Sequence, residues 1–254
     1  DSDKKKAETI FKYLHDEVFL QYELNVVVSD LSERWTYNCV TATSFFVSMA
    51  EEFGIPFQIY ETPAHVYASI RHRNEEVIVE LTAPKDGFDF GSNMESLLQT
   101  LVDSKLISRD ELAEKGAEQL YQEYVAKTIP ISKKQLLAIQ YHNDALIKAS
   151  EENYEGAYDQ MNKAIKLYPN DTFSEAFKYI ITISQLNFTL EADKKYLLIS
   201  KLLESTKNDS TLTYSLVNHL GELIEDLLKF EENFDLVNEL LQNVENNVLT
   251  DAFI

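Results

Sequence analysis

Glycine and proline are both scarce in this chain. The 254 residues include 6 glycines and 5 prolines, whereas an average usage of about 7% would give roughly 18 glycines. A chain with few turn formers and few helix breakers favours helices. Most of these residues lie within the first 91 positions, namely Gly54, Gly87, Gly91, Pro56, Pro63 and Pro84. The distribution predicts a mixed α+β front part followed by an all-helical back part.

Cysteine and long apolar runs are also nearly absent. The single cysteine, Cys39, excludes a disulfide framework and a Cys-rich zinc site. No apolar run approaches the ~18 residues that a membrane span needs, so we expect no membrane insertion. No spacing of His, Asp and Glu resembles a metal site, and no pair of glycines forms a phosphate-binding loop. We therefore expect no metal and no cofactor.

Basic residues are outnumbered almost two to one. The chain has 23 Lys and Arg against 43 Asp and Glu, which gives a net charge of −20. The excess is spread along the chain, and a field of this sign repels phosphate backbones and anionic lipid. We therefore expect neither nucleic acid nor a membrane surface as a partner. A solvated surface that keeps the protein soluble explains the charge, and a preference for basic partners is the alternative.

Hydrophobic spacing predicts the elements of the front part. Apolar residues at helical spacing predict an amphipathic helix over 5–22. Residues 25–38 show no clean period and are interpreted as a connecting segment. The segment 39–53 is apolar on most faces, which predicts a buried helix that Gly54 and Pro56 terminate. Three short strands are expected at 56–61, 65–70 and 77–81, the last two joined by a hairpin turn within 71–76.

The part after Gly91 is predicted to be helical throughout. Capping boxes begin at Ser108, Ser132 and Thr172. The segment 127–132, which contains Pro130, is the best break between long helices, so the expected domains are 1–130 and 131–254.

The second predicted domain repeats helical hairpins. A set of residues has the spacing of a tetratricopeptide repeat, with its period of ~34 residues: Tyr141, Ala145, Tyr154, Ala157, Ala164 and Pro169. Two degenerate hairpins follow, at 173–185 with 192–203 and at 214–230 with 234–244. Stacked hairpins of this kind bind a protein partner or form a structural cap on the front domain.

Three residues of the front part form a candidate catalytic group. Cys39 lies at the expected N-terminus of the buried helix, where the helix dipole favours a thiolate, although a lone Cys is more often a buried hydrophobe. His65 begins one strand of the hairpin and Glu80 lies on the next. If paired residue numbers sum to 147, His65 and Glu80 share a face. The carboxylate would then orient the imidazole, and the imidazole would take the thiol proton.

The remaining site candidates concern the stabilisation of a developing oxyanion. The backbone N–H of Cys39 is a natural donor, as at any helix start. A second donor is expected upstream, and Asn38, Tyr37 and Trp35 are the candidates, with packing roles as the alternative for Trp35 and Tyr37. Tyr67 shares the face of His65 and either lines the cleft or belongs to the core. Asp86 is the alternative to Glu80 as the orienting acid.

The motifs resemble a known family. They are Tyr-Asn-Cys-Val-Thr-Ala-Thr at 37–43, Gly-Ile-Pro at 54–56, Glu-Thr-Pro-Ala-His-Val-Tyr at 61–67 and Val-Glu-Leu-Thr at 79–82. Over residues 7–91 the chain is similar to the transglutaminase-like domain, in particular to the bacterial branch in which tetratricopeptide repeats follow. The resemblance implies a papain-like α+β fold with Cys39 as nucleophile, His65 as base and an acid on the next strand. Much of the superfamily has Asp-Pro at that acid, whereas this chain has Glu80 followed by Leu and Thr.

The resemblance also implies a function. It is acyl transfer on amide or peptide bonds of a protein or peptide substrate, with hydrolysis favoured over transamidation. The alternative is a catalytically silent scaffold whose helical repeats bind a protein. The chain begins at Asp1 without methionine, and together with the resemblance this indicates an exported protein, periplasmic or in the cell envelope, whose signal segment has been removed.

Overall fold

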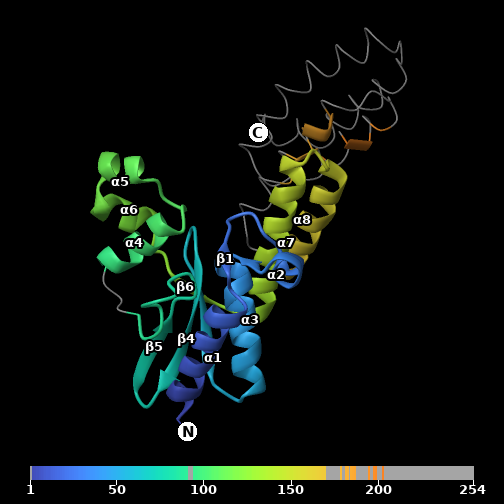
Figure 1. The fold of residues 1–254 in the computed structure, drawn as a ribbon. Helices are drawn as coiled ribbons and strands as arrows, with labels where there is room; N and C mark the ends of the chain where they lie inside the picture. Colours follow the sequence, from blue (N-terminus) through green and yellow to red (C-terminus); the bar gives the residue numbers. More distant parts are fainter. Residues whose placement is uncertain are drawn as a thin grey trace, which may run out of the picture. The chain divides into compact units, whose positions relative to one another are not determined.

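The computed structural model describes residues 2–90 and 94–169 and a few separate residues between 178 and 202, with the side chains of 94–97 left out. The chain divides into two compact units, Asp1–Ile147 and Lys148–Ile254. The first unit is a mixed α+β domain (Figure 1).

The first unit contains seven helix segments and six strands in its described part. The helices are α1 (Asp3–Glu17), α2 (Val28–Arg34), α3 (Cys39–Glu52), α4 (Met94–Asp103), α5 (Arg109–Lys115), α6 (Ala117–Tyr124) and the greater part of α7 (Lys133–Ser150). The strands are β1 (Gln21–Tyr22), β2 (Thr36–Tyr37), β3 (Phe57–Glu61), β4 (Val66–His72), β5 (Glu75–Val79) and β6 (Ile129–Ile131).

The main sheet is antiparallel and has the order β5-β4-β3-β6. In the β4–β5 hairpin, Ala68 pairs with Val79 and Ile70 with Val77, so paired numbers sum to 147 and the predicted register is confirmed. A separate parallel pair joins β1 to β2, with Tyr22 opposite Tyr37. This short pair leads directly into α3.

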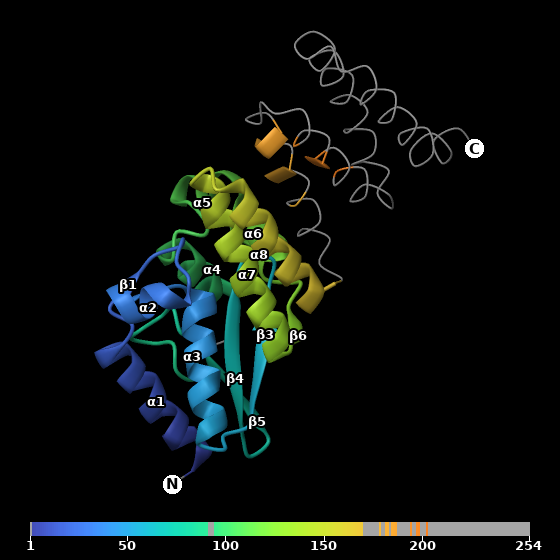
Figure 2. The ribbon, with the colours of Figure 1, turned by 90° about the vertical axis from the view of Figure 1, so that its right-hand side faces the viewer.

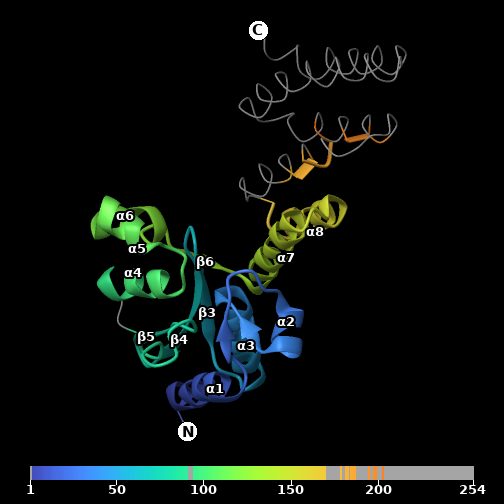
Figure 3. The same ribbon diagram turned by 45° about the horizontal axis from the view of Figure 1, so that its top comes forward.

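Helices cover both faces of the main sheet. α1 and α3 lie together on one side (Figure 2), and the cluster α4–α6 lies on the other (Figure 3). The main core lies between the sheet and the first pair of helices, and its fully buried side chains include Leu14, Phe46, Ile59 and Ile70. Phe46 projects from α3, the helix that is apolar on most faces, as its sequence predicts.

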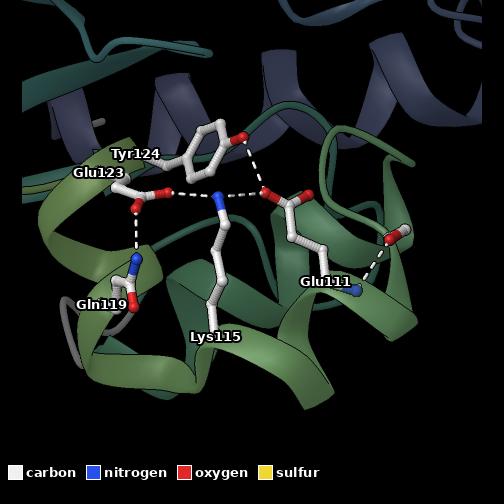
Figure 4. A network of polar contacts seen from close by, with 6 residues as sticks. Glu111, Lys115, Gln119, Glu123 and Tyr124 are labelled. Atoms are coloured by element: carbon white, nitrogen blue, oxygen red, sulfur yellow. Dashed lines mark hydrogen bonds and ion pairs between the residues drawn. The ribbon is translucent and has the colours of Figure 1, made fainter.

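The α4–α6 cluster has a small core of its own. Leu98, Leu101, Ile107, Leu120 and Val125 form this core. A polar network on the outside joins α5 to α6 (Figure 4). There, Lys115 Nζ contacts Glu111 Oε1 at 3.0 Å and Glu123 Oε2 at 2.8 Å, and Tyr124 donates its hydroxyl proton to Glu111 Oε1 at 3.2 Å. The network holds the two short helices together from the solvent side.

The second unit is helical in its described part. It contains α8 (Tyr154–Leu167), which Asn153 caps by accepting a hydrogen bond from Gly156 N at 3.1 Å. Ala157, Met161 and Ala164 are buried, and Pro169 follows the end of the helix as predicted. The capping box at Thr172 and the hairpins of 173–203 and 214–244 lie outside the described residues or almost entirely so.

Several elements differ from the sequence prediction. The helix predicted over 5–22 ends at Glu17, and Phe19 joins the core from the loop that follows. The segment 25–38 holds α2 and β2, two elements too short to show a period.

The predicted domain break also has a different structure. Residues 129–131 form β6, with Tyr60 of β3 opposite Pro130. Proline is tolerated there because β6 is an edge strand. The prediction that everything after Gly91 is helical is therefore wrong at β6.

Three predicted helix signals are confirmed. Gly54 terminates α3 with φ +66°, and Ile55 N donates to Ala50 O at 2.8 Å. Ser108 caps α5 by accepting from Glu111 N at 3.0 Å. Ser132 and Gln135 form a reciprocal capping box at the start of α7, in which Ser132 N donates to Gln135 Oε1 at 2.9 Å and Gln135 N donates to Ser132 Oγ at 3.3 Å.

Gly87 is required by a close approach of two backbone segments. A Cβ at this position would lie 1.9 Å from Glu80 O and 2.5 Å from Ala83 O. Gly87 O accepts the N–H of Glu80 at 2.7 Å, so this loop holds Glu80 in place.

We expect Gly87→Ala to lower the free energy of unfolding by about 1–3 kcal/mol, as overpacking does, measured by urea denaturation. Asp86→Ala, in the same loop but exposed, is the control and should unfold like the wild type. Equal stability of the Gly87→Ala protein would contradict the packing described here.

Candidate functional site

Cys39 is the first residue of α3, and Asn38 is the N-cap. The Asn38 side chain accepts a hydrogen bond from Thr41 N at 2.9 Å, and Thr41 Oγ1 accepts one from Asn38 N at 2.8 Å. This reciprocal cap fixes the direction in which α3 starts. The thiol therefore lies at the positive end of the helix dipole, and the N–H of Cys39 belongs to the first turn, whose amides have no acceptor within the helix.

Asn38 also fastens the helix start to the upstream chain. Its Nδ2 donates to Leu24 O at 3.0 Å and to Val26 O at 3.1 Å. The β1–β2 pair continues this attachment, because Glu23 N donates to Tyr37 O at 2.9 Å. Both amide hydrogens of Asn38 are thereby used in the fold.

His65 and Glu80 lie at the neighbouring ends of β4 and β5. The register places Tyr67 next to Glu80, and His65 lies two residues before Tyr67 on the same face. The imidazole Nε2 and Glu80 Oε2 are 2.7 Å apart, with side-chain exposures of 4% and 1%. The predicted pairing of these two residues is therefore present in the structure, and both groups are inaccessible to water.

Local hydrogen bonds hold each partner of this pair. Thr62 N donates to His65 O at 2.8 Å across the β3–β4 turn. Glu80 Oε1 accepts from Thr82 N at 2.9 Å and from Thr82 Oγ1 at 2.6 Å. Both carboxylate oxygens are thus satisfied, which a buried charge requires.

The environment makes both groups of the pair ionised. Burial lowers the pKa of His65, but the charges of Glu80 and Cys39 and hydrogen bonds to both outweigh it and raise this pKa to about 10. Burial raises the pKa of Glu80, and the positive charge of His65 with the hydrogen bonds from His65 and Thr82 more than offsets this, so that the pKa is lowered overall. The pair is therefore an imidazolium facing a carboxylate near neutral pH.

The second ring nitrogen of His65, Nδ1, is not bound by Glu80. Nδ1 is buried and has no well-aligned hydrogen-bond partner among the described residues. Cys39 acts on the same ring, both through its charge and as a hydrogen-bonding side chain. The three predicted residues Cys39, His65 and Glu80 thus meet in one place, where one imidazole nitrogen is held by the acid and the other is free for the thiol.

A cavity of about 150 Å³ adjoins His65 and Glu80. It lies between the sheet and the α4–α6 cluster. His65, Glu80, Tyr67 and Ile78 line it from the sheet, while Leu101 and Tyr121 are among the residues that line it from the helices. Tyr67 stacks over His65 with ring centroids 6.5 Å apart, so it lines this cavity, which is one of its two predicted places.

The structure separates the oxyanion candidates. Asn38 donates both amide hydrogens to backbone carbonyls, so its side chain has no hydrogen left for a substrate. Tyr37 is 3% exposed and stacks on Phe19 at 4.9 Å, which makes it a packing residue. Trp35 is 46% exposed and adopts the left-handed conformation (φ 58°) where α2 ends. Asp86, the alternative acid, is exposed.

One buried hydroxyl group of this region, that of Tyr22, was not predicted from the sequence. Tyr22 lies on β1 opposite Tyr37, and its hydroxyl oxygen is buried. Its pKa is raised, first by burial and then by the negative charge of Cys39. The segment between Phe19 and Asn38 has no periodicity, so nothing in the sequence indicated that Tyr22 pairs with Tyr37, two residues before Cys39.

Among the described residues, no group of three or more His, Cys, Asp and Glu side chains could hold a metal ion. In the same part of the chain, no helix has both the length and the apolar character needed to cross a membrane. The chain matches no protein-family model, no curated protein and no solved structure at a significant level.

The His65–Glu80 pair should make stability depend on pH. Removal of one partner of a buried pair costs about 3–5 kcal/mol, so we expect Glu80→Ala to be destabilised by roughly that amount at pH 7. The contribution of His65, whose pKa is raised, is complete below its unfolded value of 6.5 and is lost as the pH rises through about 10. The contribution of Glu80, whose pKa is lowered, is lost as the pH falls below its unfolded value of 4.5.

The measurement is urea unfolding of the wild type and Glu80→Ala at pH 7 and at pH values around 10. The difference in unfolding free energy should shrink towards the higher pH. Glu75→Gln, which alters an exposed carboxylate on the same strand, is the control and should show no such difference. A gap that is equally large at both pH values would refute an ionised pair.

Proposed function

We propose that this protein catalyses thiol-dependent acyl transfer on amide or peptide bonds, with Cys39 as nucleophile, His65 as base and Glu80 as the orienting acid. The observation that carries the proposal is the buried 2.7 Å contact between His65 Nε2 and Glu80 Oε2. This contact fixes the ring and leaves Nδ1 for the Cys39 thiol. A nucleophile, a base and an orienter in this order form the arrangement that activates a weak nucleophile.

The proposed reaction has two steps. The Cys39 thiolate attacks the amide carbonyl carbon, and the imidazolium of His65 gives its proton to the departing amine, which leaves a thioester. A water molecule then attacks the thioester, His65 takes its proton, and the acid is released with the thiol restored. An amine in place of water would give transamidation with the same residues, and we propose hydrolysis as the main outcome.

The same arrangement supports the family resemblance. A helix that begins at the nucleophile and packs on an antiparallel sheet, whose adjacent strands carry the base and the acid, is what the resemblance implies for residues 7–91. We propose on this basis that the first unit is a papain-like, transglutaminase-like domain. We propose further that residues 131–254 are a tetratricopeptide-like array. The short connection between α7 and α8, the buried Ala157 and Ala164, and Pro169 after α8 support that assignment.

The lining of the cavity supports the proposed substrate class. The cavity beside His65 has both hydroxyl-bearing and apolar walls, among them Thr100, Thr128, Ile78 and Leu101. Such a mixed lining suits a side chain of a protein or peptide.

A second candidate function is a scaffold without catalysis. The observation in its favour is that Cys39 is only 8% exposed and the side chains of His65 and Glu80 still less. In that case the buried ion pair serves the fold, and the helical repeats bind a protein partner. The two functions differ in the reactivity they require of Cys39.

Alkylation of Cys39 by iodoacetamide separates the two functions. Because the chain has one cysteine, every labelled molecule reports on Cys39. We expect the wild type to react at pH 6–7, where an ordinary thiol with a pKa of about 8.5 is largely protonated. His65→Ala should lose this reactivity by at least about tenfold, because the imidazolium that stabilises the thiolate is gone. The measurement is the alkylation rate as a function of pH, followed by intact mass.

The matched control is His72→Ala, which removes the histidine at the other end of the same strand and should react like the wild type. Absence of labelling in the folded wild type would instead establish a buried structural thiol and favour the scaffold.

A labelled casein assay then distinguishes the two enzymatic outcomes. Release of peptides that Cys39→Ala abolishes indicates hydrolysis, and incorporation of an added primary amine indicates transamidation.

A further inference from the structure

Attack on a carbonyl by the Cys39 thiolate places a negative charge on the carbonyl oxygen. One donor for that oxygen is the N–H of Cys39 in the first turn of α3. Two of the candidates expected upstream, Asn38 and Tyr37, do not supply a second. Asn38 uses both amide hydrogens on backbone carbonyls, and Tyr37 is packed against Phe19.

The tyrosine on the neighbouring strand is in a suitable position. Tyr22 is paired with Tyr37 in the parallel β1–β2 ladder, and their ring centroids are 5.5 Å apart. Tyr37 precedes Cys39 by two residues in extended backbone, so Tyr22, Tyr37 and Cys39 lie on the same side of this short ladder. The Glu23 N to Tyr37 O hydrogen bond of 2.9 Å keeps the two strands in register beyond the pair.

The Tyr22 hydroxyl is available as a hydrogen-bond donor. Its oxygen is buried and makes no well-aligned hydrogen bond with any described residue, a condition that normally costs free energy. Cys39 acts on its ionisation through charge, and Ser104 acts on it as a hydrogen-bonding side chain. Burial and the charge of Cys39 raise its pKa, so the phenol keeps its proton at the pH at which the thiolate acts.

We propose that Tyr22 is a catalytic residue whose hydroxyl donates a hydrogen bond to the oxyanion formed at Cys39, beside the N–H of Cys39. This inference rests on the proposed acyl transfer. The hydroxyl lacks a strong partner in the free protein because its partner is the substrate oxygen in the transition state. Donors of this kind act where charge develops, and removing one costs about 10²–10³ in rate.

The inference is tested by two reagents that differ in one respect. Iodoacetamide is attacked at a saturated carbon, where the thiolate forms a C–S bond, iodide leaves and no oxyanion develops. p-Nitrophenyl acetate is attacked at its carbonyl carbon, where the C=O electrons move to oxygen before the tetrahedral intermediate collapses. Collapse expels p-nitrophenolate and leaves S-acetyl Cys39, and hydrolysis then returns the thiol and releases acetate.

The variant is Tyr22→Phe, which keeps the ring and its contact with Tyr37 and removes the hydroxyl alone. We expect acetylation of Cys39 to fall by about 10²–10³, while alkylation by iodoacetamide stays within about twofold of the wild type. Preserved alkylation also shows that the variant retains its folded site. Tyr37→Phe, in the same ladder, is the matched control and should leave both rates unchanged. Cys39→Ala supplies the background from other nucleophiles, and intact mass identifies the acetyl group.

Each outcome has one meaning. Equal acetylation of the Tyr22→Phe protein and the wild type would overturn the role of Tyr22 and leave the acyl-transfer proposal standing. A parallel loss of both reactions would show that Tyr22 supports the thiolate or the fold instead. Loss of acetylation only in Tyr37→Phe would assign the donor to Tyr37. A wild type that reacts with neither reagent would overturn both the function and this inference.

Discussion

An imidazole and a carboxylate meet at 2.7 Å inside the first unit of this protein, and the surrounding structure is arranged to make that contact possible. Two charged groups withdrawn from water cost free energy unless each is paired and fully hydrogen-bonded. The carboxylate of Glu80 meets that condition through His65 and Thr82. The imidazole meets half of it, since its Nδ1 has no well-aligned partner among the described residues. A half-satisfied buried histidine is costly for stability, and under the proposed function the Cys39 thiol is the partner of this nitrogen.

The fold brings these groups together from three separate segments. The β4–β5 register sets His65 and Glu80 on one face, and the backbone contact at Gly87 holds the strand end that carries Glu80. Cys39 is brought by α3, whose start is fixed by Asn38 through its cap and its bonds to the upstream chain. The Cys39 side chain then lies at the positive end of the α3 dipole, and the imidazolium of His65 faces the carboxylate of Glu80.

The sequence predicted the parts of this site that depend on regular structure. The alternation of strand residues and the short turn determined the register, because a slip by one residue would have exposed Ile70 and Val77, which are buried. The apolar stretch beginning at Cys39 and the breakers Gly54 and Pro56 marked α3. Strand register and helix ends of this kind depend on a few adjacent residues, so they can be predicted without a structure.

What the sequence did not predict depends on contacts between distant segments. β1, β2 and β6 have two or three residues each, too few for a period, and they exist because neighbouring strands supply hydrogen bonds. Tyr22 therefore looked like one tyrosine among 14, although the β1–β2 pair places it opposite Tyr37, two residues before Cys39. The same holds for Asn38, which resembled an oxyanion donor until its bonds to Leu24 and Val26 showed both amide hydrogens in use.

The central claim is that His65 is a buried imidazolium held between Glu80 and Cys39. Long-range ¹⁵N–¹H correlation NMR of histidine-labelled protein tests it most directly, because the two ring nitrogens report their protonation separately. With a pKa of about 10, His65 should show both ring nitrogens protonated at pH 8, and the His65 signal should move towards the neutral form in Glu80→Gln. A neutral His65 ring at pH 8 in the wild type would contradict the account.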